Sequence, residues 1–173
     1  DFLLSLGAHP DQIFIAPNCA LDLNAIPIDQ EKLNELRQKV NPNKKIVISY
    51  LGRIVRYKAL DTLIVAFARL EQKRDDVFLL IAGDGPFAFD CKKLINKLNI
   101  KNCYWPQYTK LHETKAQEPV PQSELLYYYH LTNIFVLPGR FIWKDNVPCE
   151  SWGFTINEAL SLGIPTVSTT SVA

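Results

Sequence analysis

Short apolar runs alternate along the chain with segments of helical periodicity. The apolar runs, most of them rich in β-branched residues, predict strands at 13–17, 45–51, 77–83, 102–105, 133–138 and 165–169. Apolar residues three and four positions apart predict helices at 29–40, 60–72, 89–98, 122–130 and 155–162. Because the strands are continuously apolar and take turns with helices, we expect an α/β fold, a Rossmann-like parallel sheet with helices on both faces.

Three of these helices carry further local signals. Asp29 is expected to cap the helix at 29–40, because its carboxylate can accept hydrogen bonds from the free N–H groups of the first turn. In the helix at 60–72, the residues expected on the buried face are Leu63, Ala66, Phe67 and Leu70. The run "LLYYYH" at 125–130 points around a whole helix, so we expect it to pack against the sheet rather than to bind a sugar.

Composition places the chain among ordinary soluble globular proteins. It has 173 residues, of which 47% are hydrophobic and 21% charged, and its net charge is +1. We therefore expect a single domain over 1–173, with neither nucleic acid nor an anionic membrane as its main partner. No apolar run reaches the roughly 18 residues that indicate a transmembrane helix. Cysteines at 19, 91, 103 and 149 form no C-x-x-C pair, which predicts reduced thiols and a cytoplasmic location.

Two polar segments interrupt the alternation of strands and helices. Residues 106–121 and 138–149 contain prolines and flank predicted strands. We expect both to be loops at the carboxyl edge of the sheet, where parallel α/β sheets bind ligands. Arg140, Trp143 and Lys144 could contribute to ligand choice there, and the alternatives of a lid or of surface decoration stay open.

The exit of the strand at 45–51 carries two cations. Gly52 allows a tight exit, and Arg53 and Lys58 lie in the loop or in the first turn of the next helix. A guanidinium can grip phosphate oxygens bidentately and an ammonium adds a point charge, while a helix N-terminus favours anions. The pattern is typical of a phosphate site, although surface cations that face only water have the same pattern.

The exit of the next strand reads "GDGP". Gly83 and Gly85 permit positive φ and a close approach of the backbone to a ligand, although the motif alone is an ordinary turn. No third glycine follows at the spacing of a dinucleotide fingerprint. The sequence therefore disfavours a nicotinamide-dependent oxidoreductase.

Two glutamates flank the start of a predicted helix. Glu150 and Glu158 are separated by seven residues, and the helix is expected to begin near Gly153 or Phe154. A carboxylate suits a vicinal diol, because its two oxygens can accept from adjacent hydroxyls. A sugar or ribose laid across the helix start is the favoured ligand, and a solvated helix residue is the alternative for Glu158.

These motifs occur in an order that resembles a known family. The segments "GRIVRYKALDTLIVAF", "IAGDGP", "ELLYYYHLTNIFVLP" and "ESWGFTINEALSLGIPTV" are similar to the donor-binding half of a retaining glycosyltransferase of family 4. This is the large group 1 family, whose members have the two-domain GT-B fold. The resemblance covers residues 10–173, and Ala59 departs from it, because relatives commonly have glycine there.

The resemblance implies a role for each matching position. Arg53 and Lys58 match the basic pair that holds the donor diphosphate, Glu150 the glutamate near the donor sugar, and Glu158 the glutamate that binds the ribose. Arg53, Lys58 and Glu150 are thereby the expected catalytic residues. The other positions implied in donor binding are Gly52, Gly83, Gly85, Trp105 (near the base), Gly153, Phe154 and Thr155.

The resemblance also implies a function for the protein. It implies transfer of a hexose from a nucleoside-diphosphate sugar to an acceptor in glycan, polysaccharide or glycolipid synthesis, with no metal or other cofactor. Because the chain contains no methionine, we expect it to be a fragment. An N-terminal acceptor domain is then absent, peripheral membrane association would run through that domain, and the isolated fragment is expected to be inactive. A noncatalytic sugar-nucleotide-binding domain and a GT-B phosphorylase, hydrolase or epimerase are the alternatives.

Overall fold

A computed structural model describes residues 2–14, 19–41, 43–106, 122–140 and 153–170. Its centre is a parallel sheet in the order β3-β2-β1-β4-β5. The strands are β1 (Ile46–Leu51), β2 (Val77–Ala82), β3 (Cys103–Tyr104), β4 (Ile134–Leu137) and β5 (Thr166–Ser168). The parallel pairing confirms the fold class predicted from the continuously apolar strands.

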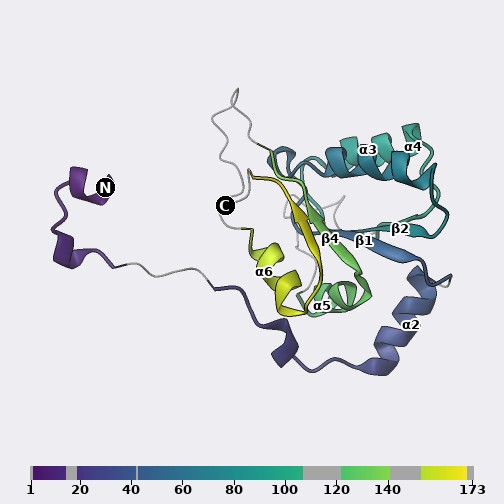
Figure 1. Ribbon diagram of the computed structural model, residues 1–173, viewed down its shortest axis with the longest axis horizontal. Helices are drawn as coiled ribbons and strands as arrows, with labels where there is room; N and C mark the ends of the chain where they lie inside the picture. The colour runs from purple at the N-terminus through teal and green to yellow at the C-terminus, as the bar shows by residue number, and fades with distance from the viewer. Residues whose placement is uncertain (1, 15–18, 42, 107–121, 141–152, 171–173) are drawn as a thin grey trace, which may run out of the picture.

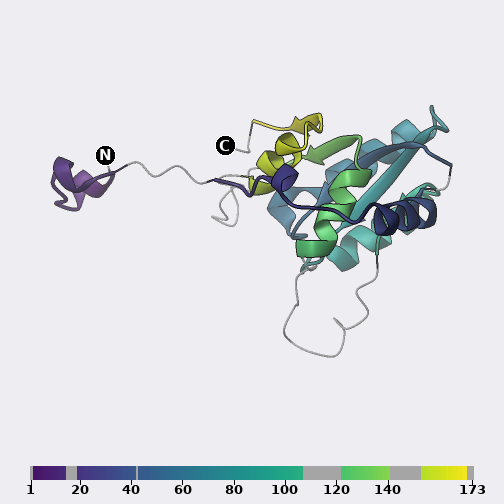
Figure 2. The ribbon, with the colours of Figure 1, turned by 90° about the horizontal axis from the view of Figure 1, so that it is seen from below.

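Helices cover both faces of this sheet. The α-helices are α1 (Phe2–Ser5), α2 (Gln30–Val40), α3 (Leu60–Glu71), α4 (Ala88–Lys97), α5 (Gln122–Leu131) and α6 (Phe154–Ser161). Short 3-10 turns are η1 (Pro10–Gln12), η2 (Leu23–Ala25) and η3 (Arg56–Lys58). Figure 1 shows α3 and α4 on one face and α2, α5 and α6 on the other, and Figure 2 views the second face. The predicted three-layer arrangement is confirmed.

The strand order determines where a ligand can bind. The chain runs outward from β1 through β2 to β3, and then crosses back through α5 to β4 and outward again to β5. Connections therefore leave β1 and β4 in opposite directions, which makes this neighbouring pair a topological switch point. Ligands of open α/β sheets bind beyond the carboxyl ends of the strands at such a point.

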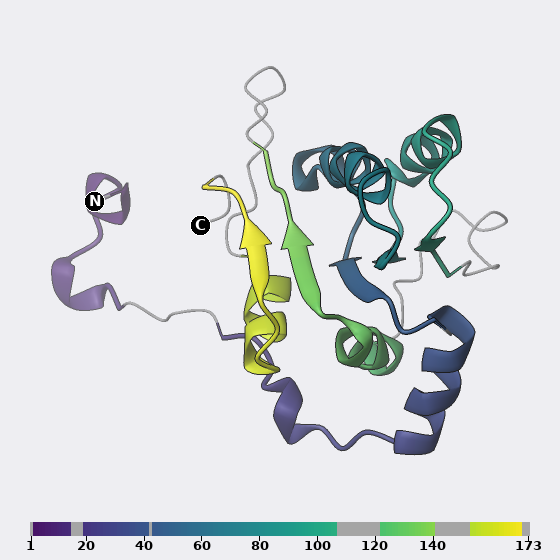
Figure 3. The same ribbon diagram turned by 45° about the vertical axis from the view of Figure 1, so that its right-hand side comes forward.

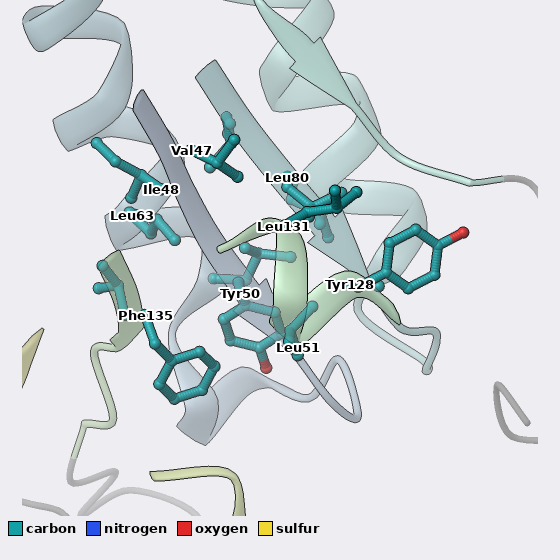
Figure 4. Close-up of a cluster of buried hydrophobic side chains, with 14 of the residues drawn as sticks. Val47, Ile48, Tyr50, Leu51, Leu63, Leu80, Tyr128, Leu131 and Phe135 are labelled. Carbon is teal, nitrogen blue, oxygen red and sulfur yellow. The ribbon is translucent and has the colours of Figure 1, made fainter. Parts of the chain in front are cut away.

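The hydrophobic core lies on both sides of β1. Figure 4 shows Leu63 of α3 beside Ile48, and Leu131 of α5 near Leu80 of β2. Tyr50, in β1, is completely buried, and its hydroxyl donates to the carbonyl of Arg53 at 2.8 Å. Packing on two faces explains why the strand is apolar at nearly every position and not only at alternate ones.

Local signals for helix ends are confirmed. The Asp29 carboxylate accepts from the N–H groups of Glu31 at 2.9 Å and Lys32 at 3.2 Å. After α6, Gly163 has φ +69° and the N–H of Ile164 returns to the carbonyl of Ala159 at 3.0 Å. The left-handed residue closes the last turn, so α6 ends where the glycine predicted.

Two local predictions are wrong. Ala66 is exposed, whereas the buried face of α3 comprises Leu60, Leu63, Ile64, Phe67 and Ala68. At 100° per residue, Ala66 points well away from the direction shared by those side chains. Of the strand predicted at 13–17, Ile13 and Phe14 are not in a strand and Phe14 is 84% exposed. The purple N-terminal segment of the chain lies away from the sheet (Figure 1), and 15–17 lie outside the described residues.

Among the described residues, no helix is long and apolar enough to cross a membrane.

Candidate functional site

The carboxyl end of β1 brings together residues that are far apart in the sequence. A Cβ atom added to Gly52 would lie 3.5 Å from Thr155 Cγ2 and 4.0 Å from Lys58 Nζ. Gly52 follows β1 directly, and Thr155 lies in the first turn of α6, which packs beside β4 and β5 (Figure 3). The structure thus gathers three predicted site residues at the topological switch point.

Lys58 is presented by a tight turn between β1 and α3. It ends η3, and the next residue, Ala59, adopts a left-handed conformation with φ 54°. Ala59 is fully buried, so the strained turn is retained without a glycine. This turn places the lysine at the N-terminus of α3 and beside Gly52.

Arg140 braces this turn instead of facing a ligand. Its backbone N–H donates to the carbonyl of Tyr57 at 2.8 Å, and its Nε donates to the carbonyl of Arg56 at 3.0 Å. The guanidinium also forms an ion pair with Asp61 of α3. These contacts hold the backbone just before Lys58 and the Asp61 side chain just after it, and a role of Arg140 in ligand choice stays a prediction.

Arg53 differs from Lys58 in its surroundings. Its side chain is exposed, and no hydrogen bond or ion pair to its guanidinium is found within the described ranges. Only its carbonyl is engaged, by the Tyr50 hydroxyl. Its assignment as a phosphate ligand stays a prediction.

The N-terminus of α6 has the features of an anion site. Gly153 is its buried N-cap with φ 66°, and because glycine has no side chain, this residue provides no side-chain cap. The Thr155 hydroxyl is buried and has no hydrogen-bond partner among the residues that the structure describes. Native proteins rarely bury an unpaired hydroxyl. Because the Thr155 side chain lies beside Gly52 and near the Lys58 ammonium, the first turn of α6 is suited to a bound anion.

Glu158 lies one turn further along α6, on the same side as Thr155. Its Oε2 accepts from the hydroxyl of Tyr129 at 2.6 Å. Burial, together with the neighbouring Glu158 carboxylate, raises the pKa of Tyr129 well above the ordinary value of a phenol. Tyr129 was predicted only to pack against the sheet. No spacing signal could reveal its bond to a glutamate on another helix.

The glycines of the β2 exit allow close contact with the backbone of another loop. A Cβ at Gly83 would lie 1.9 Å from the carbonyl oxygen of Gly52, and one at Gly85 2.2 Å from that of Ile54. The backbones of the two loops are also hydrogen-bonded to each other, since the N–H of Ile54 donates to the carbonyl of Asp84 at 2.8 Å. The glycines are thus explained by contact between the loops after β1 and β2, and their role in donor binding stays a prediction.

Trp105 is attached to the same loop. Its indole N–H donates to the carbonyl of Gly83 at 3.1 Å, and the Lys92 ammonium lies 5.1 Å from the ring centroid. The residue therefore joins the exit of β3 to the exit of β2, at the edge of the site where the base is predicted. Phe154, the other aromatic residue expected to bind the donor, is 43% exposed.

Several predictions fall outside the described residues. These include Glu150 and most of the two predicted loops, at 107–121 and 141–149. No group of three or more His, Cys, Asp or Glu that could hold a metal is found in the described ranges.

Burial raises the pKa of the Cys91 and Cys103 thiols to about 12, so both stay protonated near neutral pH.

Comparison with known proteins identifies the family. The model of the family "Glycosyl transferases group 1" matches residues 31–172. This chain belongs to the group 1 glycosyltransferases. It is 30% identical over 143 residues to an alpha-monoglucosyldiacylglycerol synthase of Streptococcus pneumoniae, a match that covers 82% of this chain and 28% of that relative.

A further relative and a solved structure are also similar to this chain. A GDP-mannose-dependent alpha-(1-6)-phosphatidylinositol monomannoside mannosyltransferase of Mycobacterium tuberculosis is 26% identical over 167 residues, which are 96% of this chain and 40% of that enzyme. The crystal structure of Anabaena HepE in complex with UDP has a TM-score of 0.67 and 17% identity, over 98% of this chain and 42% of that one. This group 1 chain therefore spans well under half the length of these relatives, and its fold is that of one part of them.

Proposed function

We propose that this chain is the donor-binding domain of a retaining glycosyltransferase that moves a hexose from a nucleoside-diphosphate sugar to an acceptor. One observation carries the proposal. The Lys58 ammonium and the Thr155 side chain meet beside Gly52 at the N-terminus of α6, the Thr155 hydroxyl has no partner among the described residues, and a carboxylate lies one turn further on. An anion and a diol can occupy such a site together.

The proposed pose follows the polarity of the site. The diphosphate lies between Lys58 and the first turn of α6, with Arg53 reaching its outer oxygens. Glu158 accepts hydrogen bonds from the ribose, and the base lies toward Trp105. Glu150, which lies outside the described residues, is proposed to contact the hexose. UDP in the HepE structure and the GDP-mannose dependence of the mycobacterial relative support a nucleotide donor.

The chemistry needs the positive groups in the transition state. As the bond between the anomeric carbon and the diphosphate oxygen breaks, its electron pair moves to the leaving nucleoside diphosphate. The acceptor hydroxyl forms the new bond on the same face, and its proton passes to the leaving diphosphate oxygen. Lys58, Arg53 and the α6 N-terminus stabilise the growing phosphate charge, so we propose that these groups act without a metal ion.

The acceptor belongs to the proposal only as a class. The pneumococcal relative is named as a synthase of a glucosylated diacylglycerol and the mycobacterial one as acting on a phosphatidylinositol mannoside. Glycolipid synthesis is therefore the favoured process. A further domain of the same protein would supply the acceptor site, and the protein would work in the cytoplasm at a membrane surface.

A calorimetric titration tests donor binding directly. UDP, GDP, ADP and the corresponding nucleoside monophosphates are titrated into the wild-type chain and into its Lys58→Ala and Lys44→Ala variants. We expect one diphosphate to be preferred, and Lys58→Ala to weaken it about tenfold or more while changing the monophosphate less. Lys44→Ala removes an equal charge at the other end of the sheet and should change neither. Lack of binding to every diphosphate would refute the proposal.

A further inference from the structure

A buried tyrosine on α5 holds the carboxylate of Glu158. The Tyr129 hydroxyl lies 2.6 Å from Glu158 Oε2, although the two residues are 29 positions apart. Tyr129 is 2% exposed, whereas Glu158 is only partly buried. One oxygen of the carboxylate is therefore fixed from within the protein.

The tyrosine is itself held in place. Its ring packs against that of Phe135 in β4, with centroids 6.1 Å apart and planes inclined at 44°. Its helix packs against β1 and β2, in the middle of the sheet. The phenol thus approaches α6 from a fixed direction, and it does so with a short, rigid side chain.

The hydroxyl has two acceptors within reach but only one proton. Glu158 Oε2 lies at 2.6 Å, and the carbonyl of Thr155 lies at 3.4 Å, beyond the usual range for O–H···O. The raised pKa of Tyr129 keeps the proton on the phenol. The hydrogen bond is therefore donated by Tyr129 to the glutamate.

We propose that Tyr129 is a positioning residue, which holds the Glu158 carboxylate so that its other oxygen accepts from the ribose hydroxyls of the donor. This inference rests on the proposed function of Glu158. A glutamate side chain has several rotatable bonds, and ordering it on binding costs affinity. With Oε2 engaged, that ordering is complete before the ligand arrives, and Tyr129 never touches the ligand.

A second anchor of α6 provides a contrast. At the far end of the helix, Ser161 Oγ donates to the carbonyl of Glu158 at 2.8 Å and accepts from the N–H of Leu23 at 3.2 Å. These bonds hold the backbone of α6 without contacting the carboxylate. Ser161→Ala therefore loosens the same helix, while leaving the bond from Tyr129 to Glu158 intact.

The test compares ribonucleotides with their 2′-deoxy and 3′-deoxy counterparts. Dissociation constants of the preferred nucleoside diphosphate and both analogues are measured by calorimetry for the 173-residue chain and for Tyr129→Phe, Tyr128→Phe and Ser161→Ala. We expect Tyr129→Phe to weaken the ribonucleotide about tenfold and the weaker-binding deoxy analogue hardly at all. Tyr128→Phe removes a hydroxyl from the same helix. It should leave the ratio of ribonucleotide affinity to deoxynucleotide affinity unchanged, as should Ser161→Ala.

A double-mutant cycle separates positioning from a general structural effect. If Tyr129 acts through the carboxylate, Tyr129→Phe has no further effect on ribonucleotide affinity in a Glu158→Ala background. Phenylalanine retains the ring, and melting temperatures verify that each variant is folded. The same tenfold loss in that background, or an unchanged ratio in Tyr129→Phe alone, would overturn the inference. If the wild-type chain binds the ribonucleotide and its deoxy analogues equally, the proposed ribose-binding role of Glu158 is refuted, and the role of Tyr129 is refuted with it.

Discussion

The two ends of the sheet both carry positive charge, yet only one of them is suited to a ligand. At the amino end, a pocket of about 250 Å³ is lined by Arg37, Lys44, Lys45 and His130. At the carboxyl end, the Lys58 ammonium lies beside Gly52 and Thr155. Cationic side chains alone therefore do not distinguish a binding site from a structural surface.

The difference lies in how the polar groups are satisfied. At the amino end, the side chain of Asn41 accepts from the N–H of Lys45 at 3.0 Å and donates to its carbonyl at 2.7 Å. The Lys45 ammonium donates to Asn102 Oδ1 at 2.6 Å. At the carboxyl end, the Thr155 hydroxyl has no partner among the described residues. Satisfied groups hold strands in place, whereas a buried hydroxyl without a partner is unusual in a native protein and calls for another explanation, such as a bound ligand.

The largest expected effect concerns the backbone contact beneath the carboxyl-end site. Gly83→Ala places a methyl group 1.9 Å from the carbonyl oxygen of Gly52, and should destabilise the fold by at least about 3 kcal/mol. Gly163→Ala, with no atom within 4 Å and φ +69°, should cost only about 1 kcal/mol. Urea denaturation measures both. If both variants lost only about 1 kcal/mol of unfolding free energy, the close contact between the two loops would not be needed for stability.

The next effect concerns catalysis by the whole enzyme. Lys58→Ala should lower turnover about a hundredfold, equivalent to about 3 kcal/mol, because a preorganised positive group is lost from the transition state. Lys44→Ala at the amino end serves as the matched control and should leave turnover unchanged. The measurement is steady-state transfer to acceptor, with the melting temperature as a check of folding. Near-normal turnover of Lys58→Ala would contradict the prediction that only the carboxyl end of the sheet takes part in catalysis.

A smaller effect is expected from the amino end, and on stability alone. Asn41→Ala removes the hydrogen bonds to both backbone groups of Lys45 and should cost about 2 kcal/mol. Nucleotide affinity should stay unchanged, because these bonds lie at the amino end of the sheet, away from the nucleotide site. Urea denaturation and calorimetry together check this prediction. Weaker nucleotide binding by a folded variant would mean that the two ends are coupled.

The smallest effect is a dependence of stability on pH. Burial, and then the charge of Arg37, lower the pKa of His130 from its ordinary value of 6.5. The unfolded chain then binds more protons than the folded one just below that value, so stability falls as the pH drops from about 6.5 through the folded-state pKa. The ring is only partly buried, and the change in melting temperature should be slight. In His130→Gln, this part of the pH dependence should disappear, and its persistence would assign it to other groups.

Much of the fold follows from local sequence pattern. Continuous apolar strands predict a buried parallel sheet, the Asp29 carboxylate predicts a helix start, and Gly163 predicts a helix end. These signals depend on residues only a few positions apart, and so they can be interpreted without coordinates. Where the pattern was ambiguous, as for Ala66 in α3, the packing of the helix decided which side is buried.

The sequence by itself determined the candidate chemistry of the site: a glycine and a lysine after β1, and a glutamate inside a helix that begins at Gly153. Only the tertiary structure decided which side chains support them. Arg140 meets Asp61 and Tyr129 meets Glu158 across different elements. The physical reason is that a hydrogen bond depends on distance in space, and the crossing of α5 to the other face of the sheet, which places Tyr129 beside α6, has no counterpart in residue spacing.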